Sequence, residues 1–303
     1  MSTIRIGTRG SALALAQSRG IAADLARVTG EMPEIVVVRT IGDADQTTRL
    51  AAFGGAGAFT TEIDSAQREG RFEVSVHSLK DLPTQGRDGL ALVAVPPRAP
   101  VEDCLVARDG ATLATLRHGA VVGTGSERRR AALRRLRPDL ELVAIRGNVD
   151  TRLRRVRDGD VDATLLARAG LTRLSLLDAV TEVIDADVLV PAAGQGALAI
   201  VVREDAPESV HAAVRRLDHA ETRAEIVAER AVLARLGGGC HLPLGALARC
   251  RDGRLRLHAR VIAPDGSAEL DERAEGAADG AAALGDLLGA RLVDAGAHAL
   301  LGT

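Results

Sequence analysis

A rhythm of short apolar runs and amphipathic segments, which occurs twice along the chain, constrains the fold most strongly. In the first set, predicted strands and helices alternate at residues 4–7, 11–28, 34–38, near 60–70 and 74–77. In the second set they alternate at residues 104–107, 120–124, 126–137, 141–145, 149–158 and 163–167. Strands that alternate with helices in this way form a parallel, doubly wound sheet. We therefore predict two similar α/β domains, with Pro96, Pro97 and Pro100 marking a hinge between them.

The last third of the chain departs from this rhythm. After Pro191, the apolar run 197–202 is a candidate strand that crosses back to complete the first sheet. A helix over 220–236 precedes three alternating strands, which are joined by the turns RDG at 251–253 and PDG at 264–266, and a final helix. These features predict a small α+β domain. The predicted domains are residues 1–96 with 197–216, residues 101–191 and residues 219–303.

Length and composition indicate a globular protein of the cell interior. With 303 residues the chain has room for two or three domains, and no apolar run approaches the roughly 18 residues that a membrane span needs. The N-terminus lacks the pattern of a secretory signal, so we expect a cytoplasmic protein. The three cysteines show no CxxC or zinc-ligand spacing, which argues against disulfides and a bound metal. A net charge of -2 gives no reason to expect nucleic acid or a membrane as partner.

Arginine-bearing segments follow three predicted strands, at residues 7–11, 123–130 and 146–152. Ligands of open α/β sheets bind at this end of the strands. Ser11 and Ser126 are suited to cap the helices that follow, and free N–H groups at a helix start attract anions. The arginines expected at these anion sites are Arg9, Arg128, Arg129, Arg146 and Arg152. We expect a solvated basic face from the arginines further along the second helix, which are Arg130, Arg134, Arg135 and Arg137. The segments therefore predict a ligand with several carboxylates.

Lys80 is the only lysine among the 39 Lys and Arg residues. Where arginine has replaced nearly every other cation, a remaining lysine marks either a position that needs a compact ammonium or chance survival. Lys80 and Asp81 follow the predicted strand 74–77, and Pro83 prevents a helix from continuing there. A carboxylate on such a turn suits a group that steadies a cationic intermediate and handles protons, although an ordinary surface turn is the alternative. His77 is a candidate base, but a histidine that faces the core is the favoured interpretation.

Three glycines precede Cys240, so its thiol has room and should be accessible. Because this cysteine follows a helix C-terminus, whose dipole disfavours a thiolate, permanent attachment of a group suits it better than nucleophilic catalysis. Cys104 and Cys250 lie in apolar strands and are expected to be small core residues. The glycine-rich segment 53–59 lies in a long predicted loop, which we expect to form a mobile lid. Phe59 would pack against a planar ligand or anchor this loop to the core.

The sequence resembles the porphobilinogen deaminases, a family also called hydroxymethylbilane synthases. The resemblance covers nearly the whole chain in order and rests on the segments IRIGTRGSALALAQ, VHSLKDLP, VGTGSERR, RGNVDTRL, ARAGLTRL, PAAGQGAL and AERAVLARLGGGCHLP. It implies two domains similar to periplasmic binding proteins and a third domain that carries the attachment cysteine. It also implies a dipyrromethane cofactor that Cys240 holds through a thioether. On that cofactor the enzyme would join four porphobilinogen molecules head to tail, release ammonia each time and then free hydroxymethylbilane.

The resemblance also implies roles for particular residues. Asp81 would be the catalytic carboxylate, which stabilises the azafulvene formed on deamination and binds the pyrrole N–H groups. The other cofactor-binding residues would be Cys240, Lys80, Ser126, Arg128, Arg129 and Gln195. The substrate-binding residues would be Arg9, Ser11, Phe59, Arg146, Arg152 and Arg173. This chain departs from the family at Ala56, where many members have lysine, and at Gly125 and Glu127, of which we expect Glu127 to face solvent.

Two other functions are consistent with parts of the sequence. A non-catalytic binding protein or sensor for a polycarboxylate uses the same pair of hinged domains, since a fold does not fix a function. The Cys240 segment and the Lys80–Asp81 pair argue against it. A nucleic-acid binder is the second alternative, but a net charge near zero and only three aromatic residues argue against that. We therefore expect a monomeric transferase of tetrapyrrole (haem) biosynthesis, with porphobilinogen as substrate and with no nucleic-acid or membrane partner.

Overall fold

The computed structural model describes residues 3–38, 61–238 and 242–302. The chain divides into two compact units. The first combines Met1–Ala99 with Ala197–Arg223, and the second combines Pro100–Gly196 with Ala224–Thr303. None of the helices in the described residues is long and apolar enough to cross a membrane.

A five-stranded sheet forms the centre of the first unit. Its strands are β1 (Arg5–Arg9), β2 (Glu34–Val38), β3 (Val74–Ser78), β4 (Leu90–Ala94) and β10 (Leu198–Arg203), in the order β2-β1-β3-β10-β4. β1 runs parallel to β2 and β3, whereas β10 runs antiparallel to β3 and β4. The prediction that the run 197–202 completes the first sheet is therefore confirmed.

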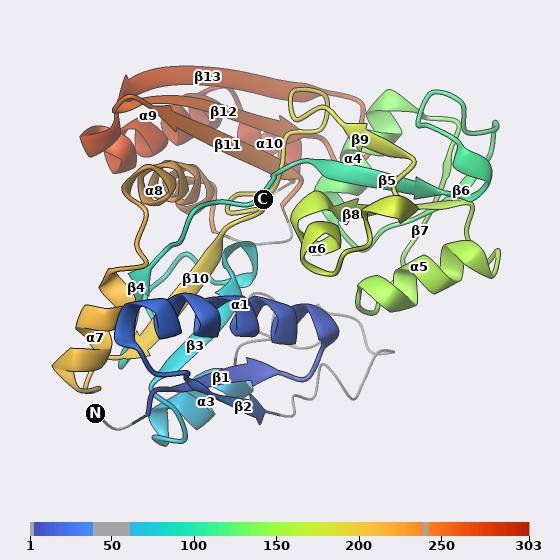
Figure 1. Ribbon diagram of the computed structural model, residues 1–303. Coiled ribbons are helices and arrows are strands. Elements are labelled where there is room, and N and C mark those ends of the chain that lie inside the picture. Colours follow the sequence, from blue (N-terminus) through green and yellow to red (C-terminus); the bar gives the residue numbers. More distant parts are fainter. Residues whose placement is uncertain (1–2, 39–60, 239–241, 303) are drawn as a thin grey trace. The chain divides into compact units, whose positions relative to one another are not determined.

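Helices cover both faces of this sheet, as in a doubly wound fold (Figure 1). The helices are α1 (Ala12–Thr29), α3 (Thr61–Arg68) and α7 (Glu208–Arg215). α1 and α7 pack against one face through Leu25 and Val214, and α3 packs against the other through Ile63, together with Phe72 from the segment that follows α3. Phe72 requires glycine opposite it on β1, because a Cβ at Gly7 would lie 2.2 Å from the ring.

A second five-stranded sheet, in the second unit, has the same design. Its strands are β5 (Asp103–Ala107), β6 (Val121–Gly123), β7 (Glu141–Val143), β8 (Ala163–Ala167) and β9 (Glu182–Ile184), in the order β7-β6-β8-β5-β9. Its helices are η3 (Arg108–Gly110), α4 (Glu127–Leu136), α5 (Val149–Arg157), α6 (Arg168–Arg173) and η4 (Leu177–Ala179). In both sheets the fourth strand is antiparallel to its two neighbours. The predicted similarity of two α/β sheets is therefore confirmed in their strand order.

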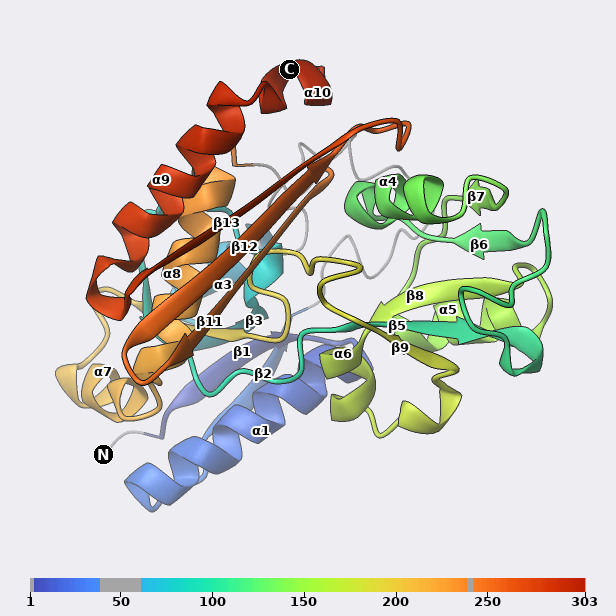
Figure 2. The same ribbon diagram turned by 90° about the horizontal axis from the view of Figure 1, so that it is seen from above.

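An antiparallel meander forms the C-terminal part of the second unit. Its strands are β11 (Leu244–Arg251), β12 (Arg254–Ile262) and β13 (Glu269–Ala277), and its helices are α8 (Ala220–Arg235), η5 (Ala278–Gly280), α9 (Ala281–Asp294) and α10 (Ala297–Leu301). α8 and α9 lie on the same face of this sheet (Figure 2), where Val232, Leu257 and Leu288 share one core. Asp252 and Gly253, both with positive φ, form the turn between β11 and β12. The predicted α+β character of this part is confirmed.

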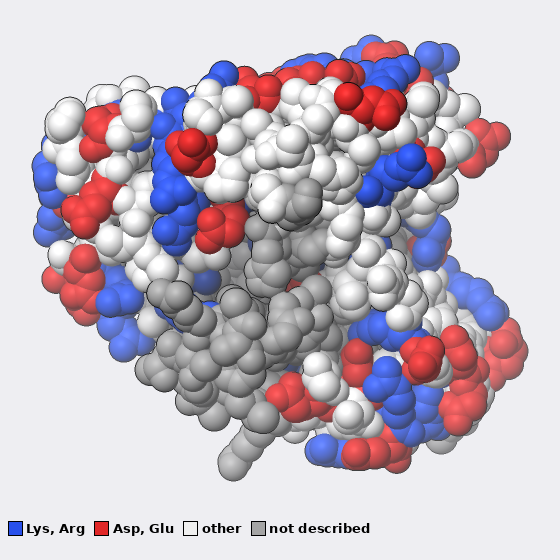
Figure 3. All heavy atoms as spheres, turned by 180° about the vertical axis from the view of Figure 1, so that it is seen from behind, with Lys and Arg blue, Asp and Glu red and all other residues white. Residues whose placement is uncertain are grey.

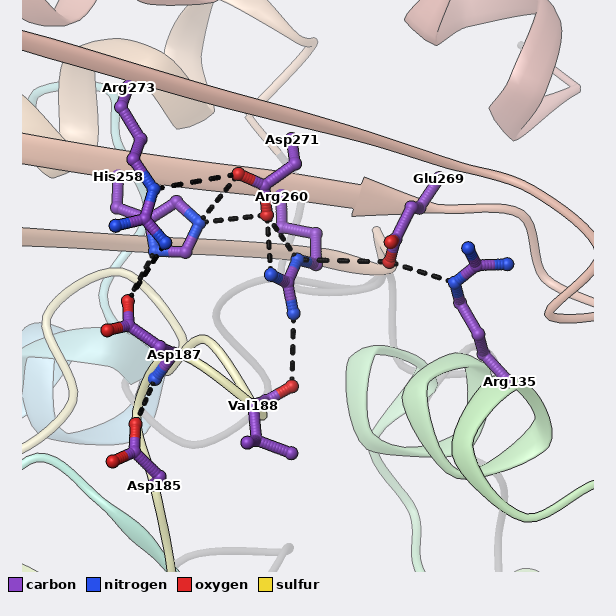
Figure 4. Close-up of polar contacts among 9 residues, drawn as sticks. All are labelled: Arg135, Asp185, Asp187, Val188, His258, Arg260, Glu269, Asp271 and Arg273. Atoms are coloured by element: carbon purple, nitrogen blue, oxygen red, sulfur yellow. Dashed lines mark hydrogen bonds and ion pairs between the residues drawn. The ribbon is translucent and has the colours of Figure 1, made fainter.

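Polar side chains join the meander to the rest of the second unit (Figure 4). Arg260 on β12 donates to the backbone carbonyl of Val188 at 3.1 Å, and Arg135 on α4 pairs with Glu269 on β13 at 3.0 Å. The other members of this cluster are Asp185, Asp187, His258, Asp271 and Arg273. Arg135 is exposed, as expected for a solvated face, and it also pairs with the meander, a contact that no local sequence pattern reveals.

Candidate active site

The first candidate residues lie where β1 ends and α1 begins. Arg9 is the last residue of β1 and is half-buried. Ser11 is the N-cap of α1, and its Oγ accepts a hydrogen bond from the backbone N–H of Ala14 at 3.3 Å. The predicted cap is therefore confirmed. Arg9 lies close to the positive end of a helix of 18 residues, so the two together suit an anion.

Lys80 and Asp81 lie on a short 3-10 helix, η2 (Leu79–Asp81), directly after β3. Leu79 anchors this turn, because its side chain is fully buried and its backbone N–H donates to the carbonyl of Ala197 at 3.0 Å. Leu82 then adopts extended backbone, as is usual for a residue before proline. Lys80 is half-buried and Asp81 is exposed. Asp81 is thus presented on a turn, as its sequence context predicts.

A row of buried, hydrogen-bonded polar side chains lies next to this turn, with His77 and Ser75 on β3 and Gln67 on α3. The Nε2 of His77 lies 2.9 Å from the Oγ of Ser75, which donates to the Oε1 of Gln67 at 2.7 Å. The Nε2 of Gln67 donates to two backbone carbonyls, so its Oε1 is the acceptor and uses the one hydroxyl hydrogen of Ser75. His77 therefore donates from Nε2. Burial, together with the positive charges of Arg87 and Arg9, lowers the pKa of His77 to about 3. The ring is neutral near pH 7, which agrees with a core histidine rather than a base.

A cluster of buried charges lies at the start of α4 in the second unit. Ser126 is the N-cap, and its Oγ accepts from the backbone N–H of Arg129 at 3.5 Å, as predicted. The Nη2 atoms of Arg128 and Arg129 donate to the two carboxylate oxygens of Asp103, at 2.7 Å and 2.6 Å. Each guanidinium also donates from Nη1 to a backbone carbonyl. Asp103 is fully buried, and the two arginines are 5% and 6% exposed.

Gln195 joins the same cluster. Its side chain is fully buried, and its Nε2 donates to Asp103 at 2.9 Å and to the backbone carbonyl of Val101 at 2.7 Å. Three predicted site residues, Arg128, Arg129 and Gln195, are thus brought together by a carboxylate that the sequence analysis did not single out. Burial alone would raise the pKa of Asp103, but its two arginine partners outweigh burial and hold the pKa well below its ordinary range.

The charges of this cluster do not balance. Two guanidinium groups and one carboxylate leave one net positive charge in a place that is shielded from water. The Nε atoms of Arg128 and Arg129 are also buried, and they donate to none of the described residues. Buried charges and buried donors without partners are unfavourable unless something compensates them. The cluster is therefore suited to receive an anionic group.

Three further predicted arginines lie elsewhere in the second unit. Arg152 on α5 donates from Nε to the carbonyl of Gly147 at 2.9 Å, and Arg146 is half-buried in the same turn. Arg173, the last residue of α6, donates to the carbonyl of Gly196 at 2.8 Å. Burial lowers the pKa of Arg173 to about 10, so it keeps its charge near pH 7. Arg173 thus supports the chain directly beside Gln195.

Two predicted site residues, Phe59 and Cys240, lie outside the described residues, as do the segment 53–59 and Ala56. Cys104 and Glu127 lie within the described residues. Cys104 is fully buried on β5, where burial raises the pKa of its thiol to about 11, so it is an unreactive core residue as expected. Glu127 has a side chain that is 45% exposed and lies beside Arg130, in agreement with its expected position toward solvent.

Together, these features describe an α/β protein with an exposed aspartate in one unit and, in the other, a buried arginine cluster that is suited to an anionic ligand. Where the chain is described, no group of His, Cys, Asp and Glu residues is placed to hold a metal ion. Two family models match the sequence. Residues 4–212 match the dipyrromethane cofactor binding domain of porphobilinogen deaminase, and residues 223–294 match its C-terminal domain.

Curated proteins of known name show the same relationship. The porphobilinogen deaminase of Leifsonia xyli is 51% identical over 270 residues, which cover 88% of this chain and 82% of that protein. The porphobilinogen deaminase of Roseiflexus castenholzii is 46% identical over 301 residues, with 99% of each chain covered. A solved structure of the methionine-binding protein MetQ has a TM-score of 0.46 and 13% identity, over 71% of this chain and 89% of that one. The chain belongs to the porphobilinogen deaminase family, which confirms the resemblance.

Proposed function

We propose that this protein is a hydroxymethylbilane synthase of tetrapyrrole (haem) biosynthesis. It joins four porphobilinogen molecules head to tail, releases ammonia with each one and then frees hydroxymethylbilane by hydrolysis. The observation that carries this proposal is membership of the porphobilinogen deaminase family along nearly the whole chain. Family membership also favours an enzyme over a non-catalytic sensor that uses the same kind of fold.

The arginine cluster fits the dipyrromethane cofactor of the family. Dipyrromethane, when bound, supplies the pyrrole end on which the chain is extended. Arg128 and Arg129 would hold one of its carboxylates, since they carry a net positive charge and two Nε donors without described partners. The other residues that would hold it are Lys80, Asp81, Ser126, Gln195 and, through a thioether, Cys240. A thioether would persist on reduction, unlike a disulfide.

Asp81 is the catalytic carboxylate in this proposal. Loss of ammonia from porphobilinogen leaves a cationic pyrrole intermediate, and a carboxylate close to it would stabilise the positive charge. Asp81 is exposed on a turn that Leu79 anchors, so its carboxylate can meet the substrate from a well-defined position. The same group can accept a proton as the new bond between pyrroles is completed.

The remaining arginines would bind the carboxylates of the substrate and the growing chain. These residues are Arg9, Arg146, Arg152 and Arg173, and the proposed substrate-binding set also includes Ser11 and Phe59. Porphobilinogen carries two carboxylate side chains, and guanidinium groups bind carboxylates in a planar, directional way. Arg9 has the additional support of a helix N-terminus next to it.

We also propose three domains, with limits at residues 1–96 and 197–216, 101–191 and 219–303. Three separate sheets support this division. We propose further that the enzyme is a cytoplasmic monomer without a nucleic-acid partner. The two cysteines that the structure describes, Cys104 and Cys250, are not joined in a disulfide, which suits a reducing compartment.

Incubation of the purified protein with porphobilinogen tests the proposed function. Ammonia and a free linear tetrapyrrole should appear in a ratio of four to one, because each tetrapyrrole consumes four porphobilinogen molecules. Binding of porphobilinogen without release of ammonia would contradict the proposal and favour a binding protein.

A further inference from the structure

We propose that Asp103 is a positioning residue, which holds Arg128 and Arg129 side by side and leaves the pair one net positive charge for a single carboxylate of the cofactor. This inference rests on the proposed function, in which the two arginines hold dipyrromethane. Asp103 itself is buried behind them and would not touch the cofactor.

The geometry of the carboxylate supports this role. Each oxygen of Asp103 accepts from a different guanidinium, at 2.7 Å from Arg128 and 2.6 Å from Arg129. Gln195 donates to the same carboxylate at 2.9 Å. Since the Nη2 atoms are directed at Asp103 and the Nη1 atoms at backbone carbonyls, the guanidinium planes cannot rotate freely. The position of both arginines is therefore set before any ligand arrives.

Electrostatics explain why such a residue is needed. Arg128 and Arg129 are the second and third residues of α4 and lie in its first turn. The helix dipole is positive at this end, so it disfavours cations there. Two neighbouring guanidinium groups that are shielded from water also repel each other. Asp103 offsets one of the two charges, and the remaining charge matches one carboxylate.

A second carboxylate of this sheet provides a natural comparison. Asp162, just before β8, also bridges two arginines, Arg108 at 2.8 Å and Arg117 at 2.6 Å. Those arginines are 47% and 64% exposed, so water can solvate them. Asp103 is on β5 and lies beside the opposite end of β8, where it pairs with Ala167. Asp162 therefore resembles Asp103 because it also bridges two arginines beside the same sheet. Its arginines, however, are exposed to water and do not form a buried site for a ligand.

The test uses apoprotein from cells that cannot make porphobilinogen. The rate at which the protein gains covalent pyrrole mass from added porphobilinogen is measured by intact mass, for the parent, Asp103→Asn and Asp162→Asn. Asn has the shape of Asp but lacks its charge and presents an amide N–H group to a guanidinium. We expect Asp103→Asn to load at least about tenfold more slowly, and Asp162→Asn to load as the parent does.

Thermal unfolding of the same apoproteins separates positioning from stability. If Asp103→Asn loads at the rate of Asp162→Asn, whatever its melting temperature, the inference is overturned while the proposed function stands. If the parent gains no mass from porphobilinogen, the proposed function fails and the inference fails with it.

A double variant keeps the inference testable if Asp103→Asn does not fold. Asp103→Asn combined with Arg128→Gln leaves the cluster with one net positive charge, as in the parent, so the double variant should fold. Because Asp103 acts by holding the two arginines as a pair, and Arg128→Gln has already removed the pair, adding Asp103→Asn to that variant should slow loading by less than about threefold. A further loss of tenfold or more would show that Asp103 does not act by holding the pair and would contradict the inference.

Discussion

Asp81 combines an exposed carboxylate with an anchored backbone. Asp81→Asn removes the charge but no buried contact, so the free energy of unfolding should change by less than about 0.5 kcal/mol. Turnover of porphobilinogen should fall by at least about a hundredfold, because the cationic intermediate loses its counter-charge. The measurement is the rate of ammonia release, with intact mass to verify that the cofactor stays attached.

Asp88→Asn is the matched control for Asp81. Asp88 is also an exposed aspartate in the segment that follows β3, but no role in the site is proposed for it. Its variant should keep the parent rate. Normal turnover by Asp81→Asn would contradict the assigned role.

His77 makes the stability of the fold depend on pH. Its pKa is about 3 in the folded protein, whereas a histidine in an unfolded chain titrates near pH 6.5. Between these values the unfolded state binds one more proton than the folded state. The free energy of unfolding should therefore fall by about 1.4 kcal/mol for each pH unit of acidification through this group. In His77→Gln, the free energy of unfolding should lose this part of its dependence on pH.

Urea unfolding between about pH 5 and pH 7 measures this dependence. The slope of stability against pH should be shallower in His77→Gln than in the parent. His118→Gln, which replaces an exposed histidine, should retain the parent slope. Equal slopes for the parent and His77→Gln would show that the ring is protonated in the folded state.

Local sequence was sufficient for some site residues and insufficient for others. The caps at Ser11 and Ser126 and the turn at Asp81 depend on neighbouring residues, so they could be predicted. Asp103 depends on a contact between β5 and α4, which no local pattern reveals. A usable signal does exist, since paired arginines in the first turn of a helix oppose its dipole and so require a nearby acid.

Among the secondary-structure elements, the interior strands of the two five-stranded sheets were all predicted, whereas the edge strands were predicted only in part. The interior strand β8 and the edge strand β2 have the predicted limits, at Ala163–Ala167 and Glu34–Val38. β4 and β9, which were not predicted, lie at the edges of their sheets, and β9 has only three residues. An edge strand is covered less completely, and three residues show no periodicity, so the sequence signal is weak.

Close packing of α9 on α8 depends on glycine. A Cβ at Gly285 would lie 2.2 Å from the carbonyl oxygen of Ala228, so the two helices would have to separate. Gly285→Ala should therefore lower the free energy of unfolding by about 1–3 kcal/mol, as measured by urea unfolding.

Gly20 in α1 is the matched control for this prediction. It is exposed, and a Cβ at this position would meet no atom within 4 Å, so Gly20→Ala should raise stability by up to about 1 kcal/mol. Changes of the same sign in both variants would contradict the packing argument.

At the scale of the whole molecule, charge is distributed without a dominant sign. The net charge is -2, and basic and acidic side chains are interspersed on the face that Figure 3 shows. A nucleic-acid binder would instead present a continuous basic surface. Arg128 and Arg129 are both buried, and a buried cationic site suits a small carboxylate ligand rather than a polyanion.

The repeat of two similar α/β sheets is the feature of the whole chain that sequence rhythm predicted best, although the rhythm predicted parallel sheets and did not predict their strand order. Each sheet receives one antiparallel strand in its fourth position, β10 in the first and β5 in the second. Rhythm alone did not identify the chemistry, because many binding proteins share such sheets. The order of motifs along the chain supplied the family, and the buried cluster around Asp103 required the structure.

Covalent attachment of the cofactor to Cys240 is the central claim, and intact mass tests it most directly. The parent protein and Cys240→Ala are denatured, reduced with thiol and weighed, before and after incubation with porphobilinogen. We predict an excess mass of two linked pyrrole units on the parent, resistant to reduction and absent from Cys240→Ala. An unmodified parent mass, even after incubation with porphobilinogen, would contradict the account.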